Sequence, residues 1–447
     1  MKYISIIDYL LLPIYISLFF LIIKAKKSKY REVGLDKFFV TAFFLHMIGA
    51  VLYAMVIQYY YGYGDSLGFF RGSTFITDLT KEEFTLKYFF YPAKKLSDLF
   101  LSSETGDNVI GSIISNDSNL MVIKISAAFS LLCFNKYLII SIFFGFFSFI
   151  GLWNLFLCFN DALQDKAQKI LAFTILYTPS IWFWGSGLMK DSICIGCLGL
   201  LMNIFYGFFI RKKIKPGNFI YAAISLYLLI VIKSYIAATF LLSFLVFFIS
   251  HFIKSRKNII EKWVYFILIT IGGMIILNLV VSEYLKSILE DSQTTIDSFK
   301  NAYENLDAMG DAGSGFSNMK DIDFTPTSIL LRSPGVVFTV LFRPFIWEIK
   351  NLMMLFSSLE SLVALFALIF LLFKLRFLKF FSYIFEDPIL LFSLIFIVIL
   401  SAIIGFSTFN FGTMVRYRIP VLPFYAFLLT SIFTRYREQK LLLVKPN

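Results

Sequence analysis

Histidine and cysteine are scarce in this sequence, which has 2 His and 4 Cys among 447 residues. Two histidines are too few for a metal site with the spacing of histidine ligands. Four cysteines provide no disulfide framework. Two of them, Cys194 and Cys197, have the spacing of a redox pair, but they lie inside an apolar run. We therefore interpret this motif as ordinary helix packing.

The sequence also lacks the short alternating segments of an outer-membrane barrel. It has no internal repeat and no matched pair of broken helices, which would indicate a transporter. It contains long apolar runs instead: 58% of the residues are hydrophobic, and the runs have about the length that crosses a bilayer as a helix. This pattern predicts an all-α polytopic membrane protein in which residues 1–447 form a single integral membrane domain.

We predict about eleven transmembrane helices from these runs. In chain order they are 4–23, 38–58, 137–159, 169–186, 192–210, 218–232, 236–253, 263–282, 351–373, 388–406 and 419–433. Two large loops separate them. We expect loop 59–136 to carry interfacial helices, including one at 119–134. Loop 283–350 is rich in glycine and serine at its centre, and we expect it to be partly flexible.

The net charge of +12 does not indicate nucleic-acid binding, because the basic residues lie in short loops and not on a continuous face. More than half of the 41 Lys and Arg are in loops 24–37, 160–168, 211–217, 254–262, 374–387 and the C-terminal tail. Positive loops face the cytoplasm. The N-terminus and both large loops should therefore lie outside and the C-terminus inside. The first run reads as an anchor, because its basic cluster follows the apolar stretch. Phe/Ile/Lys-rich usage without a retention signal favours a bacterial inner membrane.

Under this topology, charged residues from separate parts of the chain reach the outer face. They are Asp65, Lys190, Asp191, Lys233, Arg332, Arg343, Glu348, Arg416 and Arg418. A carboxylate near the surface can act as a general base toward a hydroxyl or amine. Arg and Lys at the same level can hold a phosphate. The combination suits a reaction in which a lipid-borne phosphate is the leaving group and an outward-facing acceptor attacks.

Five of these residues also have a structural interpretation. Gly-Asp-Ser around Asp65 is good turn chemistry. Asp191 can serve as the N-cap of the following helix, and Lys190 can extend to the lipid headgroups. Arg416 and Arg418 can pair with lipid phosphate.

Two further polar residues fall inside predicted spans. Glu360 lies within 351–373, where a carboxylate is costly in lipid and indicates function unless it forms hydrogen bonds between helices. His46 lies in the middle of 38–58, and we interpret it as a packed polar residue. Membrane lipids are the only partners that composition alone indicates.

The layout resembles the GT-C superfamily of membrane glycosyltransferases, which includes the protein mannosyltransferases and the aminoarabinose transferases of lipid A. In those families an acid lies early in the first large outer loop, with interfacial helices after it. "GDSLGFF" is similar, and the resemblance implies that Asp65 is the catalytic acid/base residue. "GSGLMKDS" is similar to a later outer loop with a second acid, which implies a catalytic role for Asp191. "RYRIPVLPF" resembles the segment that leads into the last span.

The resemblance implies a GT-C-like fold, a polyprenyl-phosphate-linked sugar donor and a glycan, lipid or protein acceptor. We expect the donor phosphate to be bound by basic residues at the same face, namely Arg416, Arg418, Lys190, Arg343 and Lys233. Many relatives have Asp-Glu or Asp-Asp where this chain has Asp65-Ser66. The sequence therefore assigns no metal ligands and leaves the use of a divalent cation open.

Two other functions fit the same pattern. An O-antigen-type polysaccharide polymerase also has about a dozen spans, large outer loops and essential arginines. A flippase or transporter for a lipid-linked glycan would place charges in the middle of spans, where Glu360 and His46 are the only clear candidates. The acid early in loop 59–136 favours the transferase.

Overall fold

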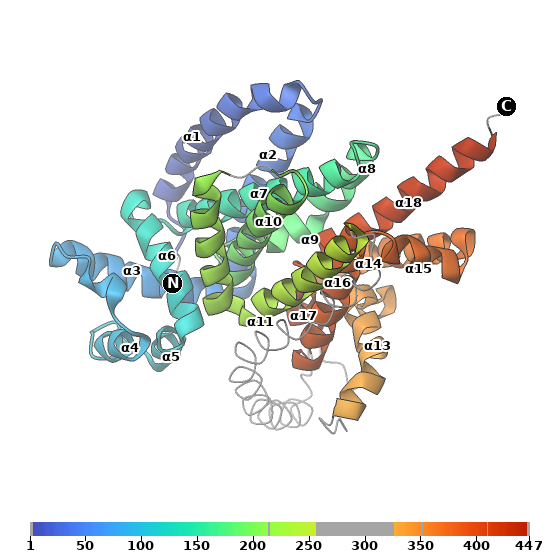
Figure 1. Ribbon diagram of the computed structural model, residues 1–447. Helices are drawn as coiled ribbons and strands as arrows, with labels where there is room; N and C mark the ends of the chain where they lie inside the picture. Colours follow the sequence, from blue (N-terminus) through green and yellow to red (C-terminus); the bar gives the residue numbers. More distant parts are fainter. Residues whose placement is uncertain (1–2, 213–214, 256–325, 350–351, 409, 445–447) are drawn as a thin grey trace. The chain divides into compact units, whose positions relative to one another are not determined.

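The structure is a computed structural model that describes residues 3–212, 215–255, 326–349, 352–408 and 410–444 (Figure 1). These residues form helices and no β-strand element, as an all-α chain requires. The sequence suggested a single domain, but the chain groups into two compact units, Met1–Ser234 (unit 1) and Tyr235–Asn447 (unit 2).

Unit 1 contains the predicted first loop and the helices around it. Its elements are α1 (Ile6–Arg31), α2 (Asp36–Met55), η1 (Val56–Tyr61), α3 (Asp65–Glu82), η2 (Lys87–Phe90), α4 (Ala93–Leu101), α5 (Asn108–Ser115), α6 (Asp117–Cys133), α7 (Tyr137–Ala162), α8 (Gln168–Leu171), η3 (Ala172–Leu176), α9 (Pro179–Trp184), α10 (Lys190–Phe209) and the first part of α11 (Pro216–Ser255). The predicted interfacial helix 119–134 corresponds to α6.

Unit 2 contains the rest of α11 and the C-terminal helices. They are α13 (Pro326–Phe342), η4 (Ile346–Glu348), α14 (Leu352–Leu375), α15 (Phe377–Phe385), α16 (Pro388–Ser407), α17 (Phe411–Tyr417) and α18 (Leu422–Val444). Part of the predicted loop 283–350 is therefore an apolar helix, α13. It packs on α16 where Gly405 lets Val336 and Val340 approach closely. Residues 283–325 lie outside the described part of the chain.

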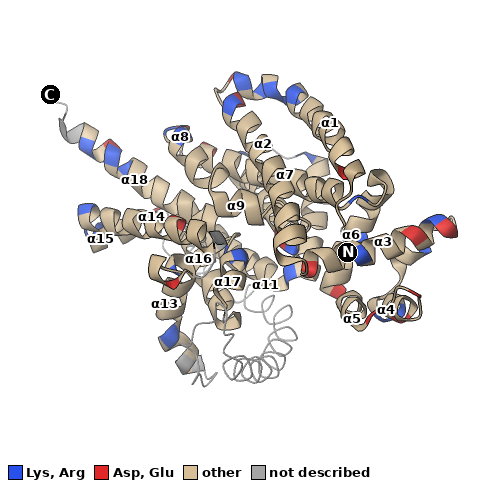
Figure 2. Ribbon diagram, turned by 180° about the vertical axis from the view of Figure 1, so that it is seen from behind, with Lys and Arg blue, Asp and Glu red and all other residues tan. Residues whose placement is uncertain are grey.

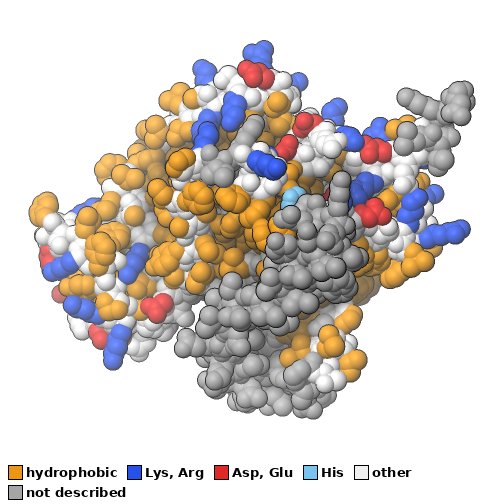
Figure 3. Space-filling model, in the orientation of Figure 1, with side chains coloured by type: hydrophobic (Ala, Val, Ile, Leu, Met, Phe, Trp, Pro, Cys, Tyr) orange, Lys and Arg blue, Asp and Glu red, His pale blue; other side chains and the backbone are white. Residues whose placement is uncertain are grey.

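Seven of the described helices are long and apolar enough to cross a membrane, or eight if the pair Phe411–Tyr417 and Leu422–Leu441, bent by 64°, forms one span. They indicate an integral membrane protein. On α1, side chains such as Leu10, Ile14 and Leu21 are exposed, and hydrophobic side chains cover much of the visible surface in Figure 3. Lys and Arg gather at the end of α1 and toward the C-terminal end of α18 in Figure 2.

Three differences separate this count from the predicted eleven. Segment 169–186 is divided into α8, η3 and α9, because Pro179 has no N–H to continue a helix and starts a new one. Spans 218–232 and 236–253 correspond to the two helical parts of α11, which meet at a kink at Lys233 and count as one apolar element. The two parts together have 39 residues, about twice the number that one crossing needs. Span 263–282 lies outside the described residues.

The core of unit 1 is the contact between α7 and α10. A Cβ on Gly199 would lie 1.9 Å from the carbonyl oxygen of Gly151, and a Cβ on Gly151 would lie 2.3 Å from Gly196. Small residues allow such close backbone approach between membrane helices. Cys194 and Cys197, on the same stretch of α10, are buried and form no disulfide, in line with a packing role.

Polar contacts divide unit 1 into two ends. At one, which we call the Asp65 end, hydrogen bonds join Tyr3 to Gln58, Ser66 to Tyr137 and Lys190 to Ser118. At the other, ion pairs join Lys27 to Asp36 and Arg211 to Asp161. Tyr30 packs against Trp153 near the end of α7, with ring centroids 5.1 Å apart. The described parts of basic loops 24–37, 160–168 and 211–217 thus share one end, and loop 59–136 and the 187–191 turn share the other. This grouping matches the alternation predicted from the Lys and Arg pattern.

Candidate functional site

The turn before α10 is held tightly and places two charged residues at the start of that helix. A Cβ on Gly187 would lie 1.9 Å from the ring of Tyr53, and Ser192 donates a hydrogen bond from its hydroxyl to the Gly187 carbonyl, at 2.6 Å. Lys190 and Asp191 follow as the first two residues of α10. Met189, and not Asp191, is the N-cap, so the capping interpretation of Asp191 was wrong.

Asp191 forms a buried ion pair with Lys233. The Lys233 Nζ lies 2.5 Å from the Asp191 Oδ1, and the two side chains are 6% and 1% exposed. Lys233 is also the residue at which the backbone of α11 leaves the helical region. A buried charge without its partner is strongly destabilising. This pair therefore joins the start of α10 firmly to the break in α11.

Lys190 contacts the first loop. Its Nζ donates to the hydroxyl of Ser118 at 2.6 Å, and that hydroxyl donates to the Asn116 side chain at 2.8 Å. Asn116 is the N-cap of α6. Unlike Lys233, Lys190 is only half-buried. Its ammonium group is therefore positioned by the turn between α5 and α6 while remaining within reach of the surface.

Asp65 completes the cluster at the Asp65 end. It is the first residue of α3, follows Gly64, whose φ of +129° favours glycine, and is exposed. The Lys190 ammonium interacts electrostatically with Lys233, Asp65 and Asp191. Four of the residues selected from the sequence, drawn from three separate segments, are therefore neighbours.

The arginines selected for phosphate binding lie in unit 2, and Arg418 is buried there. One terminal nitrogen of its guanidinium donates to the carbonyls of Val340, at 3.0 Å, and Arg343, at 2.8 Å. The other donates to the hydroxyls of Ser357, at 2.6 Å, and Ser361, at 2.7 Å. Arg418 is 1% exposed. The terminal N–H groups of the Arg418 guanidinium therefore donate to acceptors at the end of α13 and in the first turns of α14.

Both intramembrane polar residues have partners within their own unit. Glu360, on α14, interacts electrostatically with Arg418, the C-cap residue of α17. The buried ring of His46 makes a 2.9 Å hydrogen bond through Nδ1 with the Ala42 carbonyl and packs edge-on against Phe149, 5.8 Å between centroids. His46 is a packed polar residue, as expected.

Arg343 forms an ion pair with Glu348. The guanidinium Nε lies 3.0 and 3.1 Å from the two carboxylate oxygens, and the Phe345 N–H donates to the same group at 2.8 Å. Burial alone would raise the pKa of Glu348, but hydrogen bonds from Arg343 and Phe345 outweigh it and hold that pKa below its usual value. Arg416, another of the selected basic residues in this unit, is half-buried. The Cζ of its guanidinium lies 5.4 Å from the centroid of the Tyr417 ring.

Three buried polar residues with structural roles have sequence signals that could have revealed them: Asp8, Ser357 and Ser361. Asp8 is fully buried and accepts hydrogen bonds from Ser5 and from the Leu138 N–H at the start of α7. Ser-x-x-Asp at the start of an apolar run is a capping box and could have revealed it. Ser357 and Ser361 lie four residues apart on α14, a spacing that places them on one helix face.

Among the described residues, no group of three or more His, Cys, Asp or Glu side chains could hold a metal ion. No family model, curated protein or solved structure matches the chain. The resemblance to GT-C transferases therefore stays a prediction from the sequence motifs.

Proposed function

We propose that this chain is a membrane glycosyltransferase that moves a sugar from a polyprenyl-phosphate donor to an acceptor at the Asp65 end of unit 1. One observation carries the proposal: an exposed carboxylate, Asp65, neighbours a half-buried lysine, Lys190, at the start of an apolar helix. A general base and a phosphate-binding cation are the two groups that such a transfer requires.

Lys190 is the best candidate for the donor phosphate. The cluster contains two lysines. Lys233 is neutralised by its ion pair with Asp191, so we assign the binding of the donor phosphate to the ammonium group of Lys190. Lys190 also begins α10, and the N-terminus of a helix favours anions. Arg418 is less suitable, because its terminal N–H groups donate to protein acceptors.

The proposed reaction is a single displacement. The acceptor oxygen attacks the anomeric carbon as the bond from that carbon to the phosphate oxygen breaks, and polyprenyl phosphate leaves with the bonding electrons. Asp65 takes the acceptor proton, and Lys190 stabilises the charge that develops on the leaving phosphate. Attack from the opposite side inverts the anomeric configuration. Asp191 holds Lys233 and does not touch the reacting atoms.

We further propose that the Asp65 end faces outward across a bacterial inner membrane, with a cytoplasmic C-terminus. Cysteines placed at Thr105, in the first loop, and at Ser28, in the basic loop of unit 1, test this orientation. A membrane-impermeant thiol reagent added to intact cells should label position 105 and not position 28. Labelling of position 28 alone would reverse the proposed orientation.

The donor assignment is tested by the lipids that the protein retains. We expect wild-type protein, extracted mildly from a bacterial membrane, to retain polyprenyl-phosphate lipids detectable by mass spectrometry. Lys190→Ala should reduce that retention about ten-fold or more, since a hydrogen bond to a charged group contributes about 1.5–3 kcal/mol. Lys94→Ala, at an exposed position on α4, is the matched control. Equal retention by wild type and both variants would exclude Lys190 as the phosphate site.

A further inference from the structure

α15 connects two candidate spans, and its position follows from their ends. The apolar stretch of α14 ends at Leu375, and that of α16 begins at Pro388. Between them the chain turns at Arg376, which has a φ of +61°, and then forms the nine residues of α15. If α14 and α16 cross a membrane, α15 lies at its surface.

α15 is apolar on two faces. The buried face consists of Phe380, Tyr383 and Ile384. The second face carries a ladder of three phenyl rings, four residues apart, whose centroids are separated by 4.6 Å (Phe377 to Phe381) and 6.4 Å (Phe381 to Phe385). Phe377 and Phe385 are 65% and 64% exposed. Such a face requires an apolar neighbour.

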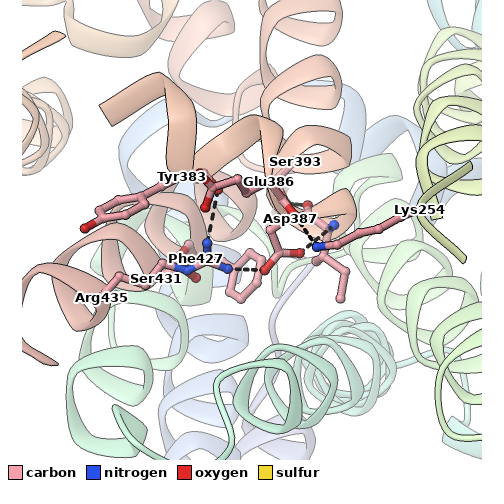
Figure 4. Close-up of polar contacts among 9 residues, drawn as sticks. Lys254, Tyr383, Glu386, Asp387, Ser393, Phe427, Ser431 and Arg435 are labelled. Carbon is pink, nitrogen blue, oxygen red and sulfur yellow. Dashed lines mark hydrogen bonds and ion pairs between the residues drawn. The ribbon is translucent and has the colours of Figure 1, made fainter. Parts of the chain in front are cut away.

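The orientation of α15 is fixed by polar contacts at its end (Figure 4). Arg435, from α18, donates to the Tyr383 carbonyl at 3.2 Å and forms an ion pair with Asp387. Lys254, at the end of α11, donates to the Glu386 carbonyl at 2.7 Å. These contacts bind the end of α15 to two other helices, so the phenyl ladder is held outward.

Three cations lie close to the ladder in the sequence: Lys374 and Arg376 directly precede α15, and Lys379 lies within it, on the side of the helix away from the three rings. Lys374, Arg376 and Lys379 are all exposed, and none forms an ion pair within the described residues. The nearby acids have other partners: Asp387 pairs with Arg435, and the Glu386 carboxylate accepts a hydrogen bond from Ser382 at 2.6 Å. α15 and its N-terminal end therefore combine exposed phenyl rings with three exposed cations that have no ion-pair partner in the described part of the chain.

We propose that α15 is an interfacial helix that binds anionic phospholipid. The rings of Phe377, Phe381 and Phe385 pack against the upper acyl chains, and Lys374, Arg376 and Lys379 contact the headgroup phosphates. An apolar helix face bordered by Lys and Arg is the pattern of a helix that lies in the membrane plane, and each cation near an anionic surface strengthens the attraction. This proposal does not depend on the proposed transferase activity.

The test uses the whole purified chain in lipid nanodiscs. A bimane label is attached to Phe385→Cys, because the four natural cysteines are buried. Brominated phosphatidylglycerol or brominated phosphatidylcholine, at equal mole fraction, serves as the quencher. We expect both to quench the label, with an excess for the anionic lipid. A triple variant carries Gln in place of Lys374, Arg376 and Lys379. In this variant the ratio of quenching by brominated phosphatidylglycerol to quenching by brominated phosphatidylcholine should fall close to one.

Val398→Cys is the matched control. Val398 lies in the middle of α16 and is 41% exposed, so its label should be quenched equally by both lipids, in the wild-type and the neutralised background alike. An unchanged strength of quenching at 398 in the two backgrounds also shows that α16 keeps its place in the neutralised variant. If iodide in the water, and not brominated lipid, quenches the label at 385, the face does not lie on lipid and the proposal fails. Equal quenching by both lipids at 385 would disprove the preference for anionic headgroups.

Discussion

Lys190 in unit 1 and Arg418 in unit 2 are both cations that the sequence suggested for phosphate binding, yet their surroundings differ. Arg418 donates to neutral carbonyls and hydroxyls from two helices and is fully buried. Lys190 donates to one hydroxyl, is half-buried and has the exposed acid Asp65 among its neighbours. A guanidinium with its donors occupied by the protein stabilises the fold, whereas a lysine with donors to spare can bind a ligand.

The sharpest way to test this contrast is to change Asp65. Asp65→Asn preserves the shape of the side chain and suits a helix start, but it cannot accept a proton. The proposed role predicts a loss of about 10²–10⁴-fold in transfer rate, measured at matched membrane abundance. Asp36→Asn, at the first residue of α2 and at the opposite end of unit 1, should leave the rate unchanged. A normal rate with Asp65→Asn would reduce Asp65 to a helix-start residue.

The ion pair of Asp191 and Lys233 should dominate the stability of the site. Asp191→Leu or Lys233→Met alone leaves a buried charge without its partner, and each should lower the free energy of unfolding by about 3–5 kcal/mol. The double variant should recover most of that loss, because no charge stays buried. Thermal unfolding of the three variants in detergent measures the coupling. Simple additivity of the two single effects would show that the pair does not act as a unit.

Arg418→Met and Lys190→Met should have opposite profiles. Loss of Arg418 leaves the Val340 and Arg343 carbonyls without their donor and should destabilise unit 2 by about 2–3 kcal/mol, with normal transfer per folded molecule. Lys190→Met should cost about 1 kcal/mol or less in stability and weaken donor binding about ten-fold or more. Measuring unfolding and transfer on the same samples separates the two effects. Loss of transfer with Arg418→Met in fully folded protein would contradict the structural role.

The smallest expected effect concerns the ion pair of Arg343 and Glu348. Because its pKa is lowered in the folded protein, Glu348 contributes stability that is present above its usual pKa of 4.5 and is lost as the pH falls through the folded value. The contribution of a partly exposed pair is at most about 1 kcal/mol. In Glu348→Gln, the free energy of unfolding should therefore fall by up to about 1 kcal/mol less than in wild type as the pH is lowered through the acid range. Glu104→Gln, at an exposed position in the first loop, should leave the profile as in wild type.

The sequence predicted the helical class and the neighbours of Lys190 because both follow from hydropathy and from the alternation of basic loops. It also predicted a break in the chain at Lys233, where a charge interrupts an apolar run. The burial of Arg418 was missed because its acceptors are mainly backbone carbonyls, which every residue has and no motif reveals.

The contact of Gly151 with Gly196 and Gly199 determines more than packing. With carbonyl against Cα and no side chain between them, α7 and α10 cannot slide past each other without a clash. Lys190 lies nine residues before Gly199, or about 14 Å along the helix. The position of Lys190 along the axis of α10, relative to the rest of unit 1, is therefore determined by the glycine contact between α7 and α10. A Gly199→Ala substitution would push α7 and α10 apart at this contact. It would thereby shift Lys190 and Asp191 at the start of α10 without contacting either residue.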